Sequence, residues 1–411
     1  MPESPRTNQI GDDREVITWG LAPAAQQPTW AGPLLAKSRD LLSAAGWLVT
    51  PSEVNELRAA LADVAEGRGQ VLQAGDCAED PSECVPELVE RKAHLLDALA
   101  TRMGADSGRP VVRVGRLAGQ FAKPRSRPTE RHGDQELPVF RGHMINDPRP
   151  DADLRQADPL RLVECYRAAS TATRYLRHRA ARGDRVWTSH EALVLDYELP
   201  LLRPIHEDKH LLTSTHWPWI GDRTRQLDGA HVQLLAAVVN PVACKVGPTM
   251  TANDLVALCE KLDPGREPGR LTLIARLGAD SVAQRLPGLV RAVRRAGFPV
   301  IWLCDPMHAN ITTTGNGHKT RRLDQVVTET WRFRAAVDAE GGTPGGLHLE
   351  ITPDDVLECV RTDAEFDQLR TPGAPPYLTH CDPRLNPSQA NEVVREWRAA
   401  RTGVALAMRT P

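Results

Sequence analysis

The sequence contains no long hydrophobic segment. None of its apolar runs approaches the roughly 18 residues that a transmembrane helix needs, and the polar amino terminus MPESPRTNQIGDDRE lacks the apolar region of a secretory signal. These absences predict a cytoplasmic protein with no membrane partner. The eight cysteines include no CxxC pair and are too dilute for a disulfide scaffold, so we expect reduced thiols that are available as metal ligands.

The chain also lacks an excess of charge of either sign. Its 51 Lys+Arg and 53 Asp+Glu give a formal net charge of −2, and 41% of its 411 residues are hydrophobic. Near-neutral charge gives no electrostatic case for a nucleic-acid partner, so any anion must be bound by a local cluster of basic residues. The hydrophobic fraction is ordinary for a globular protein with a large core.

The amino-terminal part is predicted to be an extension of the main fold. Residues 1 to about 30 are polar and rich in Pro, Gln and Ala, as in an arm without regular structure. A helix is predicted directly afterwards, because Thr50 and Glu53 have the spacing of a capping box. We therefore assign residues 1–68 to an arm and helical extension, and residues 69–411 to a catalytic barrel.

What the sequence does contain, from residue 69 on, is short apolar runs that alternate with helical patterns. Strand followed by helix, repeated, implies parallel pairing in an α/β protein. Eight such units favour a closed (β/α)8 TIM barrel over the competing open, doubly wound sheet. The apolar runs are 71–72, 111–114, 186–187, 217–220, 242–246, 271–275, 300–303 and 347–351, and the clearest helices are 251–262, 281–296 and 353–360.

Charged or metal-binding side chains follow nearly every apolar run. In a (β/α)8 barrel these positions are the carboxyl ends of the strands, where active sites are built. A polar group at every strand end costs desolvation free energy unless it has a function there, so the pattern favours a catalytic barrel. The side chains are Cys77, Arg116, His190, Glu191, Asp222, Arg223, Lys245, Arg276, Asp305, His308 and Glu350.

One set of residues has the composition of a metal site. It joins a thiol, an imidazole and two carboxylates, a mixture of donors that suits Mn²⁺, Co²⁺, Fe²⁺ or Zn²⁺ better than Mg²⁺ or Ca²⁺. The alternative is a buried thiol, a hydrogen-bonded histidine and two salt-bridged carboxylates, and sequence spacing does not decide between them. The four residues are Cys77, His308, Glu350 and Asp382.

A second set is basic and predicts a substrate that carries phosphate and carboxylate. Arginine forks match the geometry of both groups, and a strand-end lysine supplies a point charge. The strings KPRSRP and TTGNGHKTR are typical of loops that close over anions, whereas no GxxxxGK[ST] or GxGxxG motif supports a nucleotide site. Arg125, Arg127 and Arg225 are equally compatible with surface positions. The set comprises Arg116, Lys123, Arg125, Arg127, Arg223, Arg225, Lys245 and Arg276.

Eight longer strings follow one another between about residues 70 and 390: QAGDCAED, GRLAGQFAKPRS, SHEALVLDYE, WIGDRTRQLDGAH, NPVACKVGP, DPMHAN, GGLHLEIT and CDPRLN. Together they resemble the type II (plant-like) 3-deoxy-D-arabino-heptulosonate 7-phosphate (DAHP) synthases, the first enzymes of the shikimate pathway. The resemblance implies a metal-dependent barrel in which C3 of phosphoenolpyruvate attacks the aldehyde carbon of erythrose 4-phosphate. Water then adds to C2, and phosphate leaves. A homodimer or larger homo-oligomer is also implied.

The resemblance further implies a role for each candidate residue. The implied metal ligands are Cys77, His308, Glu350 and Asp382, and the metal that they bind is Mn²⁺ or Co²⁺ in the first place. Phosphoenolpyruvate binding falls on Arg116, Lys123, Arg223, Lys245 and Arg276, and binding of the aldehyde's phosphate on Arg125 and Ser126. The implied catalytic residues are Lys245 and Asp222, which orient or deprotonate the attacking water, and Arg276.

Three residues depart from the family pattern. Asp222 stands where the family has Glu, His143 where it has Asp, and Ala309 where it has Gly. These departures leave open an alternative aldehyde substrate, an amino analogue of erythrose 4-phosphate that is used in aminoshikimate routes. A non-catalytic barrel that acts as a binding partner is another alternative. A metal-dependent barrel hydrolase is disfavoured, because no His-x-His pair follows the first apolar run.

Two further expectations concern regulation. The segment between Arg161 and Ser189 is shorter than in long-form members, which carry an extra helical pair there for aromatic amino-acid feedback. We therefore predict a short form that serves secondary metabolism and is weakly inhibited, or not inhibited, by tryptophan and phenylalanine. Cys381 adjoins the candidate ligand Asp382, so convergence of the ligands predicts a disulfide between Cys77 and Cys381 in the absence of metal, with reversible oxidative inactivation. The alternative is that Cys381 is a spectator thiol.

Overall fold

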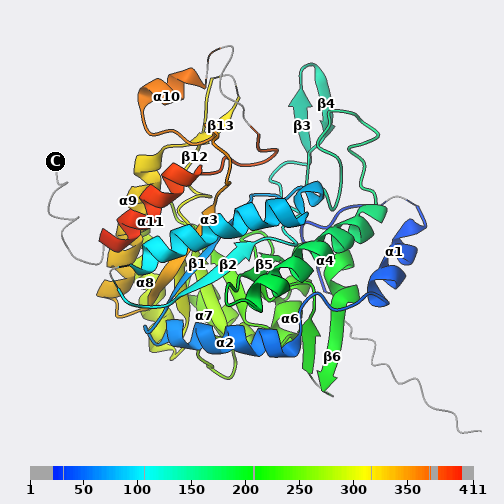
Figure 1. Cartoon of the computed structure of the whole chain (residues 1–411). Helices are drawn as coiled ribbons and strands as arrows, with labels where there is room; N and C mark the ends of the chain where they lie inside the picture. The colour runs from blue at the N-terminus through cyan, green and yellow to red at the C-terminus, as the bar shows by residue number, and fades with distance from the viewer. Residues whose placement is uncertain are drawn as a thin grey trace, which may run out of the picture.

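The eight apolar runs form the strands of a closed parallel barrel in the computed structural model (Figure 1). The structure describes residues 22–30, 32–105, 107–206, 209–315, 317–369, 371 and 378–399. The barrel strands are β1 (Gln70–Gly75), β2 (Val111–Arg116), β5 (Trp187–Glu191), β8 (Trp217–Ile220), β9 (Val242–Val246), β10 (Leu271–Ala275), β11 (Ile301–Cys304) and β14 (Pro344–Glu350). They pair in the order β1-β14-β11-β10-β9-β8-β5-β2, which confirms the (β/α)8 TIM barrel and excludes the open sheet.

Helices surround the barrel, and each buries one face. They are α1 (Leu34–Ser43), α2 (Pro51–Ala65), α3 (Pro86–Gly104), α4 (Leu160–Ala180), α5 (Leu195–Glu198), α6 (Ala230–Ala237), α7 (Ala252–Leu262), α8 (Val282–Arg295), α9 (Leu323–Ala339) and α11 (Pro387–Ala399). In α3, for example, Val89, Ala93 and Leu96 have the spacing of one helical face and are buried. α7 and α8 confirm the predicted helices 251–262 and 281–296.

Helix α2 covers the amino-terminal end of the barrel (Figure 1). It begins with the predicted capping box, in which the Thr50 hydroxyl accepts from the backbone N–H of Glu53 and the Glu53 carboxylate accepts from that of Thr50. Leu57, Leu61 and Val64 are fully buried against side chains that fill the inside of the barrel. Substrates must therefore enter from the opposite end.

The predicted helix 353–360 is wrong, because this segment is an irregular loop after β14. Its Glu358 is fully buried, and both carboxylate oxygens accept hydrogen bonds from the Arg384 side chain at 2.9 and 3.1 Å. The backbone N–H of Val360 donates to the carbonyl of Arg321 at 2.9 Å. These long-range bonds outweigh the local helical pattern, and α11 packs in the outer layer against α3 and α9 instead.

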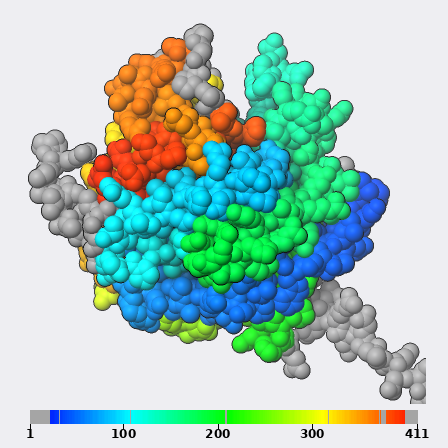
Figure 2. Space-filling view, viewed as in Figure 1, coloured from blue at the N-terminus to red at the C-terminus, as the bar shows by residue number. Residues whose placement is uncertain are grey.

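Three segments rise above the carboxyl ends of the strands (Figure 1). They are the hairpin β3 (Thr129–His132)–β4 (Gln135–Pro138), the hairpin β12 (Ile311–Thr313)–β13 (Lys319–Arg321) and helix α10 (Asp363–Gln368). Figure 2 shows the molecule hollowed between the β3–β4 hairpin and the segment of α10. A third hairpin, β6 (Leu202–His206)–β7 (Lys209–Leu212), follows α5. Within the described ranges, no helix has the length and apolar character needed to cross a membrane.

Candidate active site

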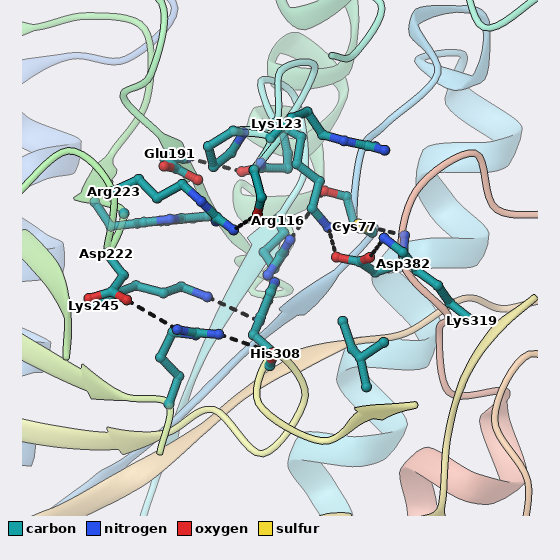
Figure 3. Close-up of a pocket in the computed structure, with 18 residues that line it drawn as sticks. Cys77, Arg116, Lys123, Glu191, Asp222, Arg223, Lys245, His308, Lys319 and Asp382 are labelled. Atoms are coloured by element: carbon teal, nitrogen blue, oxygen red, sulfur yellow. Dashed lines mark hydrogen bonds and ion pairs between the residues drawn. The ribbon is translucent and has the colours of Figure 1, made fainter. Parts of the chain in front are cut away.

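The predicted site residues meet at the carboxyl ends of the barrel strands (Figure 3). Of the residues to which the family resemblance gives a role, all except Glu350 line one cavity of about 250 Å³. Glu350 is fully buried in contact with the lining residues His308 and Lys123. The barrel topology explains this convergence, since Arg116 ends β2, Lys245 lies in β9 and Glu350 ends β14. The cavity is also lined by residues to which no role was assigned from the sequence, among them Gln120, Glu191, Trp219, Ile311 and Lys319.

The donor atoms of the predicted metal ligands converge on one side of this cavity. One ligand atom each of Cys77, Glu350 and Asp382 lies within 4.8 Å of the other two, and His308 Nε2 is 3.0 Å from Glu350 Oε1. The Lys123 ammonium contacts Cys77 Sγ and Asp382 Oδ2 and is 3.6 Å from Glu350 Oε1. This buried, largely anionic group of donors therefore attracts cations, and its mixture of sulfur, nitrogen and oxygen fits a divalent transition metal.

Asp305 fixes the orientation of the His308 ring. His308 Nδ1 is 2.9 and 2.8 Å from the two carboxylate oxygens of Asp305, so we assign the hydrogen to Nδ1. The Nε2 lone pair then faces Glu350 Oε1, and two acceptors so close together are compatible only with a proton or a cation between them. A carboxylate behind the imidazole is the usual support for a metal-ligating histidine. The residues present thus fit a divalent metal.

His348 lies in a second group of metal-type side chains with Asp305 and His308, but its bonding gives it another role. Arg116 Nη1 is 2.7 Å from His348 Nε2, and because a guanidinium only donates, Nε2 accepts this hydrogen bond. The other ring nitrogen then donates to Gln73 Oε1 at 2.6 Å. Burial holds the pKa of His348 well below its usual value, which keeps the ring neutral. His348 therefore positions Arg116 and has no lone pair left for a metal.

Lys245 places a buried ammonium group beside Asp305 and His308. Its Nζ donates to Asp305 Oδ2 at 2.6 Å, and 7% of its side chain is exposed. Burial lowers the pKa of Lys245, while the charge of Asp305 opposes that shift. A partly desolvated ammonium binds phosphate or carboxylate strongly and releases a proton more readily than a surface lysine.

Asp222, which follows β8, holds two arginines. Its Oδ2 accepts from Arg276 Nη1 at 3.1 Å, and its Oδ1 accepts from Arg225 Nε at 2.9 Å. Arg276 also donates to the backbone carbonyl of His308 at 3.1 Å. The carboxylate therefore fixes the direction of Arg276, which lines the cavity, whereas Arg225 does not line it.

The other two departures lie outside the cavity wall. His143 packs its ring edge-on against Phe140, with the ring centroids 5.3 Å apart, and Ala309 faces Gly278. Neither His143 nor Ala309 is among the described residues that line the cavity. Of the three departures, Asp222 alone is placed to touch a bound substrate.

Arg125 and Ser126 lie on the loop that follows β2, at the rim of the cavity. The Ser126 hydroxyl accepts a hydrogen bond from Arg223 Nη2, which joins this loop to the one that follows β8. Two arginines and a hydroxyl at one rim form an anion-binding arrangement. Arg127, in contrast, points away and is exposed.

Two residues without a predicted role also line the site. Glu191 is half-buried at the end of β5, its buried Oε1 has no hydrogen-bond partner among the described residues, and desolvation raises its pKa. The sequence placed Glu191 among the strand-end side chains but assigned it no role. Lys319 on β13 donates to Asp382 Oδ1 at 2.7 Å, and only the anion-loop character of TTGNGHKTR pointed to that segment.

Glu329 of α9 joins two loops of the site from behind. Its Oε1 accepts from the backbone N–H groups of Leu277 and Gly278 at 3.0 and 2.8 Å, and its Oε2 accepts from Asn310 Nδ2 at 2.6 Å. The loop after β10 begins with Arg276, and the loop after β11 contains His308. Burial raises the pKa of this carboxyl to about 8.

We expect Glu329→Gln to lower kcat/KM about tenfold. The amide nitrogen of the glutamine would lie against Asn310 Nδ2, so that two donors meet, the hydrogen bond is lost and both loops loosen. Protonation creates the same mismatch, so the wild-type rate should fall as the pH drops below about 8, and this titration should be missing in the variant. Glu340→Gln, at the outer end of α9 beside Arg291, is the matched control. Identical pH profiles of the wild type and Glu329→Gln would contradict the role.

Comparisons with known proteins agree with this geometry. The model of the class-II DAHP synthetase family matches residues 14–184 and 177–396. A probable phospho-2-dehydro-3-deoxyheptonate aldolase of Pseudomonas fluorescens is 52% identical over 92% of this chain and 95% of its own length. The phospho-2-dehydro-3-deoxyheptonate aldolase of Mycolicibacterium smegmatis is 38% identical over 90% of this chain and 91% of its own. A structure of the Francisella tularensis aldolase of that name covers 88% of this chain and 95% of its own at 11% identity, with a TM-score of 0.52, and supports the fold alone.

Proposed function

The chain belongs to the class-II DAHP synthetase family, and from this premise we propose the roles of its residues. It is a DAHP synthase, an enzyme of the shikimate pathway that condenses phosphoenolpyruvate with erythrose 4-phosphate. We propose that Cys77, His308, Glu350 and Asp382 hold a divalent metal, Mn²⁺ or Co²⁺ in the first place and Zn²⁺ or Fe²⁺ as alternatives. When bound, the metal supplies Lewis-acid polarisation of the aldehyde oxygen. The support is the buried mixed donor set and the orientation of His308 by Asp305.

The cations of the cavity allow two anionic substrates to approach each other. Arg116, Lys123, Arg223, Lys245 and Arg276 bind the phosphate and carboxylate of phosphoenolpyruvate, and Arg125 and Ser126 bind the phosphate of the aldehyde. Fixed charges in a buried cavity neutralise the substrates with little reorganisation. The condensation at C3 then needs only the correct distance and direction between the bound molecules.

The second half of the reaction adds water to C2 and releases phosphate. We assign the orientation of this water to Lys245 and Asp222, which lie at one side of the cavity with Arg276. Glu191 is a further acceptor for the proton of the water, because its buried Oε1 has no partner among the described residues. A carboxylate with a raised pKa is a stronger base than an exposed one.

The convergence of metal donors and phosphate-binding cations in one cavity carries this proposal. The direct test follows phosphoenolpyruvate consumption and phosphate release with erythrose 4-phosphate, in chelated enzyme with and without added Mn²⁺ or Co²⁺. Restoration of turnover by metal is the expected result. Metal-independent turnover would contradict the proposed centre. Turnover with the amino analogue alone would establish the alternative aldehyde, for which Asp222 is the one departure that lines the cavity.

We also propose a weakly regulated short form that serves secondary metabolism. The support is the described segment between Arg161 and β5, which consists of the rest of helix α4 and the short segment 181–186. Phosphoenolpyruvate consumption should therefore be insensitive to tryptophan and phenylalanine at physiological concentrations. Clear inhibition by either amino acid would refute this proposal.

A homodimer or larger homo-oligomer is proposed as the functional assembly. Leu34, Leu41 and Trp47, in and after α1, are 41%, 45% and 43% exposed, which is unusual for large apolar side chains close together in the chain. Light scattering of the full chain tests the proposal, and Leu41→Glu should shift the mass towards the monomer. A monomeric wild type would exclude it.

The two thiols at the metal-type donors are expected to form a disulfide when no metal is bound. Cys77 and Cys381 are buried together with Phe140 in one small cluster. Oxidation of chelated enzyme by diamide should form the Sγ–Sγ bond, with both thiol protons lost and two electrons passed to diamide, and activity should return with dithiothreitol. Mass spectrometry identifies the pair, and full activity of the diamide-treated apo-enzyme would contradict the prediction.

A further inference from the structure

A second cavity of about 430 Å³ lies beside the first. It is bounded by residues 26–29, 125–128 and 138–157, and we call it the side cavity. Arg125 and Ser126, which we place at the aldehyde's phosphate, line both cavities. A molecule bound in the side cavity would therefore touch the wall of the proposed aldehyde site.

The side cavity has an excess of positive charge. Arg125, Arg127, Arg141 and Arg155 line it. The carboxylate that neutralises part of this charge is Glu130, which accepts from Arg155 at 2.5 Å and from Arg125 at 3.3 Å. Arg141 is half-buried and bonded to the backbone carbonyls of residues 26 and 27, and no described carboxylate is bonded to it. Burial and the charge of Arg125 lower the pKa of Arg141, as expected for cations held together without an anion.

The remaining wall limits the kind of anion. Pro28, Pro138, Val139 and Ile145 give the side cavity an apolar surface on which a compact hydrocarbon body can pack. A ligand with an ammonium group finds no partner of opposite charge in the wall, because no Asp or Glu is among the described residues that line the side cavity. The chemistry thus selects a small carboxylate with an apolar body and without an amino group, and it disfavours free amino acids.

Hydrogen bonds join the side cavity to the active site. The backbone N–H of Lys123 donates to the carbonyl of Arg141 at 2.8 Å, and the backbone N–H of Arg125 donates to Gln26 Oε1 at 3.0 Å. Arg141 in turn donates to the carbonyl of Gln26. Displacement of Arg141 or Arg125 by a ligand would therefore move the loop that presents the aldehyde-binding groups.

We propose that the side cavity binds a non-amino carboxylate, which draws Arg125 away from the active cavity and weakens binding of the aldehyde substrate. The kinetic part of this inference rests on the proposed aldehyde site. The binding part does not. Because Arg125 lines both cavities, an anion that pairs with its guanidinium in the side cavity competes with the aldehyde's phosphate for the same donors.

Benzoate is the probe, with phenylalanine as the amino-acid comparison. Calorimetry on the metal-loaded enzyme should show one benzoate per chain, and Arg141→Gln should weaken this binding about tenfold, the effect of losing one charge-assisted pair. Arg127→Gln, an exposed position that is safe for folding, should weaken it as well. Arg149→Gln, an exposed arginine paired with Asp147 outside the cavity, should leave it unchanged.

Steady-state rates complete the test. Benzoate should raise the KM for erythrose 4-phosphate and leave that for phosphoenolpyruvate unchanged, and Arg141→Gln should abolish the effect. An equal rise in the KM of both substrates would place benzoate in the main cavity. Benzoate affinity that is unchanged by both Arg141→Gln and Arg127→Gln would make it an adventitious additive only. Either result overturns the proposal. Failure of the proposed function can be told apart from failure of this proposal. If the proposed function is wrong, the enzyme shows no turnover even without benzoate, while calorimetry still reports benzoate binding.

Discussion

Replacement of Cys77 by alanine is expected to reduce metal-dependent turnover at least about 100-fold and to weaken metal binding at least about tenfold. The thiol is the softest of the four proposed donors, and its loss leaves one imidazole and two carboxylates to hold the ion. Cys77 is fully buried, so its replacement removes a single sulfur atom and leaves a small cavity, a loss of stability that the control below measures. Competition with a chromophoric chelator measures metal affinity independently of turnover.

Cys165→Ala is the matched control for this experiment. Cys165 is also a buried thiol, but it lies in α4 and is not among the residues that line the cavity. Unchanged metal affinity in Cys77→Ala would show that the sulfur is not a ligand. An equal loss in both variants would indicate a general effect of removing a buried thiol, not a metal site.

Much of this architecture was predictable from the sequence because its signals are local. Apolar runs bounded by helical patterns gave the barrel strands, and the strand-end position of Lys245 or Arg116 does not depend on distant contacts. The capping box of Thr50 and Glu53 is equally local, since its atoms are three residues apart. In each case the physical cause lies within a few residues of the feature.

The features that escaped prediction depend on contacts between distant segments. The local pattern of 353–360 favours a helix, but the bonds between Glu358 and Arg384 decide its structure. His348 resembles a metal ligand until its bond to Arg116 is known. Glu329 has no sequence signal at all, because its partners are backbone N–H groups of a loop about 50 residues away. Such contacts follow from the barrel closure, which no single segment encodes.

Replacement of Lys245 by methionine is expected to lower kcat about 10²- to 10⁴-fold, the range for loss of a positioned proton donor or acceptor. Methionine keeps the length of the side chain but leaves Asp305 without the cation that it faces at 2.6 Å. Lys261→Met, on the exposed side of α7, is the control for general effects of the substitution.

Lys245→Arg separates charge from proton transfer. An arginine keeps the positive charge but does not release a proton at neutral pH, whereas burial lowers the pKa of the native lysine. If Lys245 serves mainly as a charge, Lys245→Arg should restore both phosphoenolpyruvate binding and most of kcat. If it also moves a proton during water addition, the arginine variant should bind phosphoenolpyruvate and remain slow, which is the result we expect. A methionine variant with wild-type kcat would remove Lys245 from the mechanism and leave Asp222 and Glu191 as the groups that act on the water.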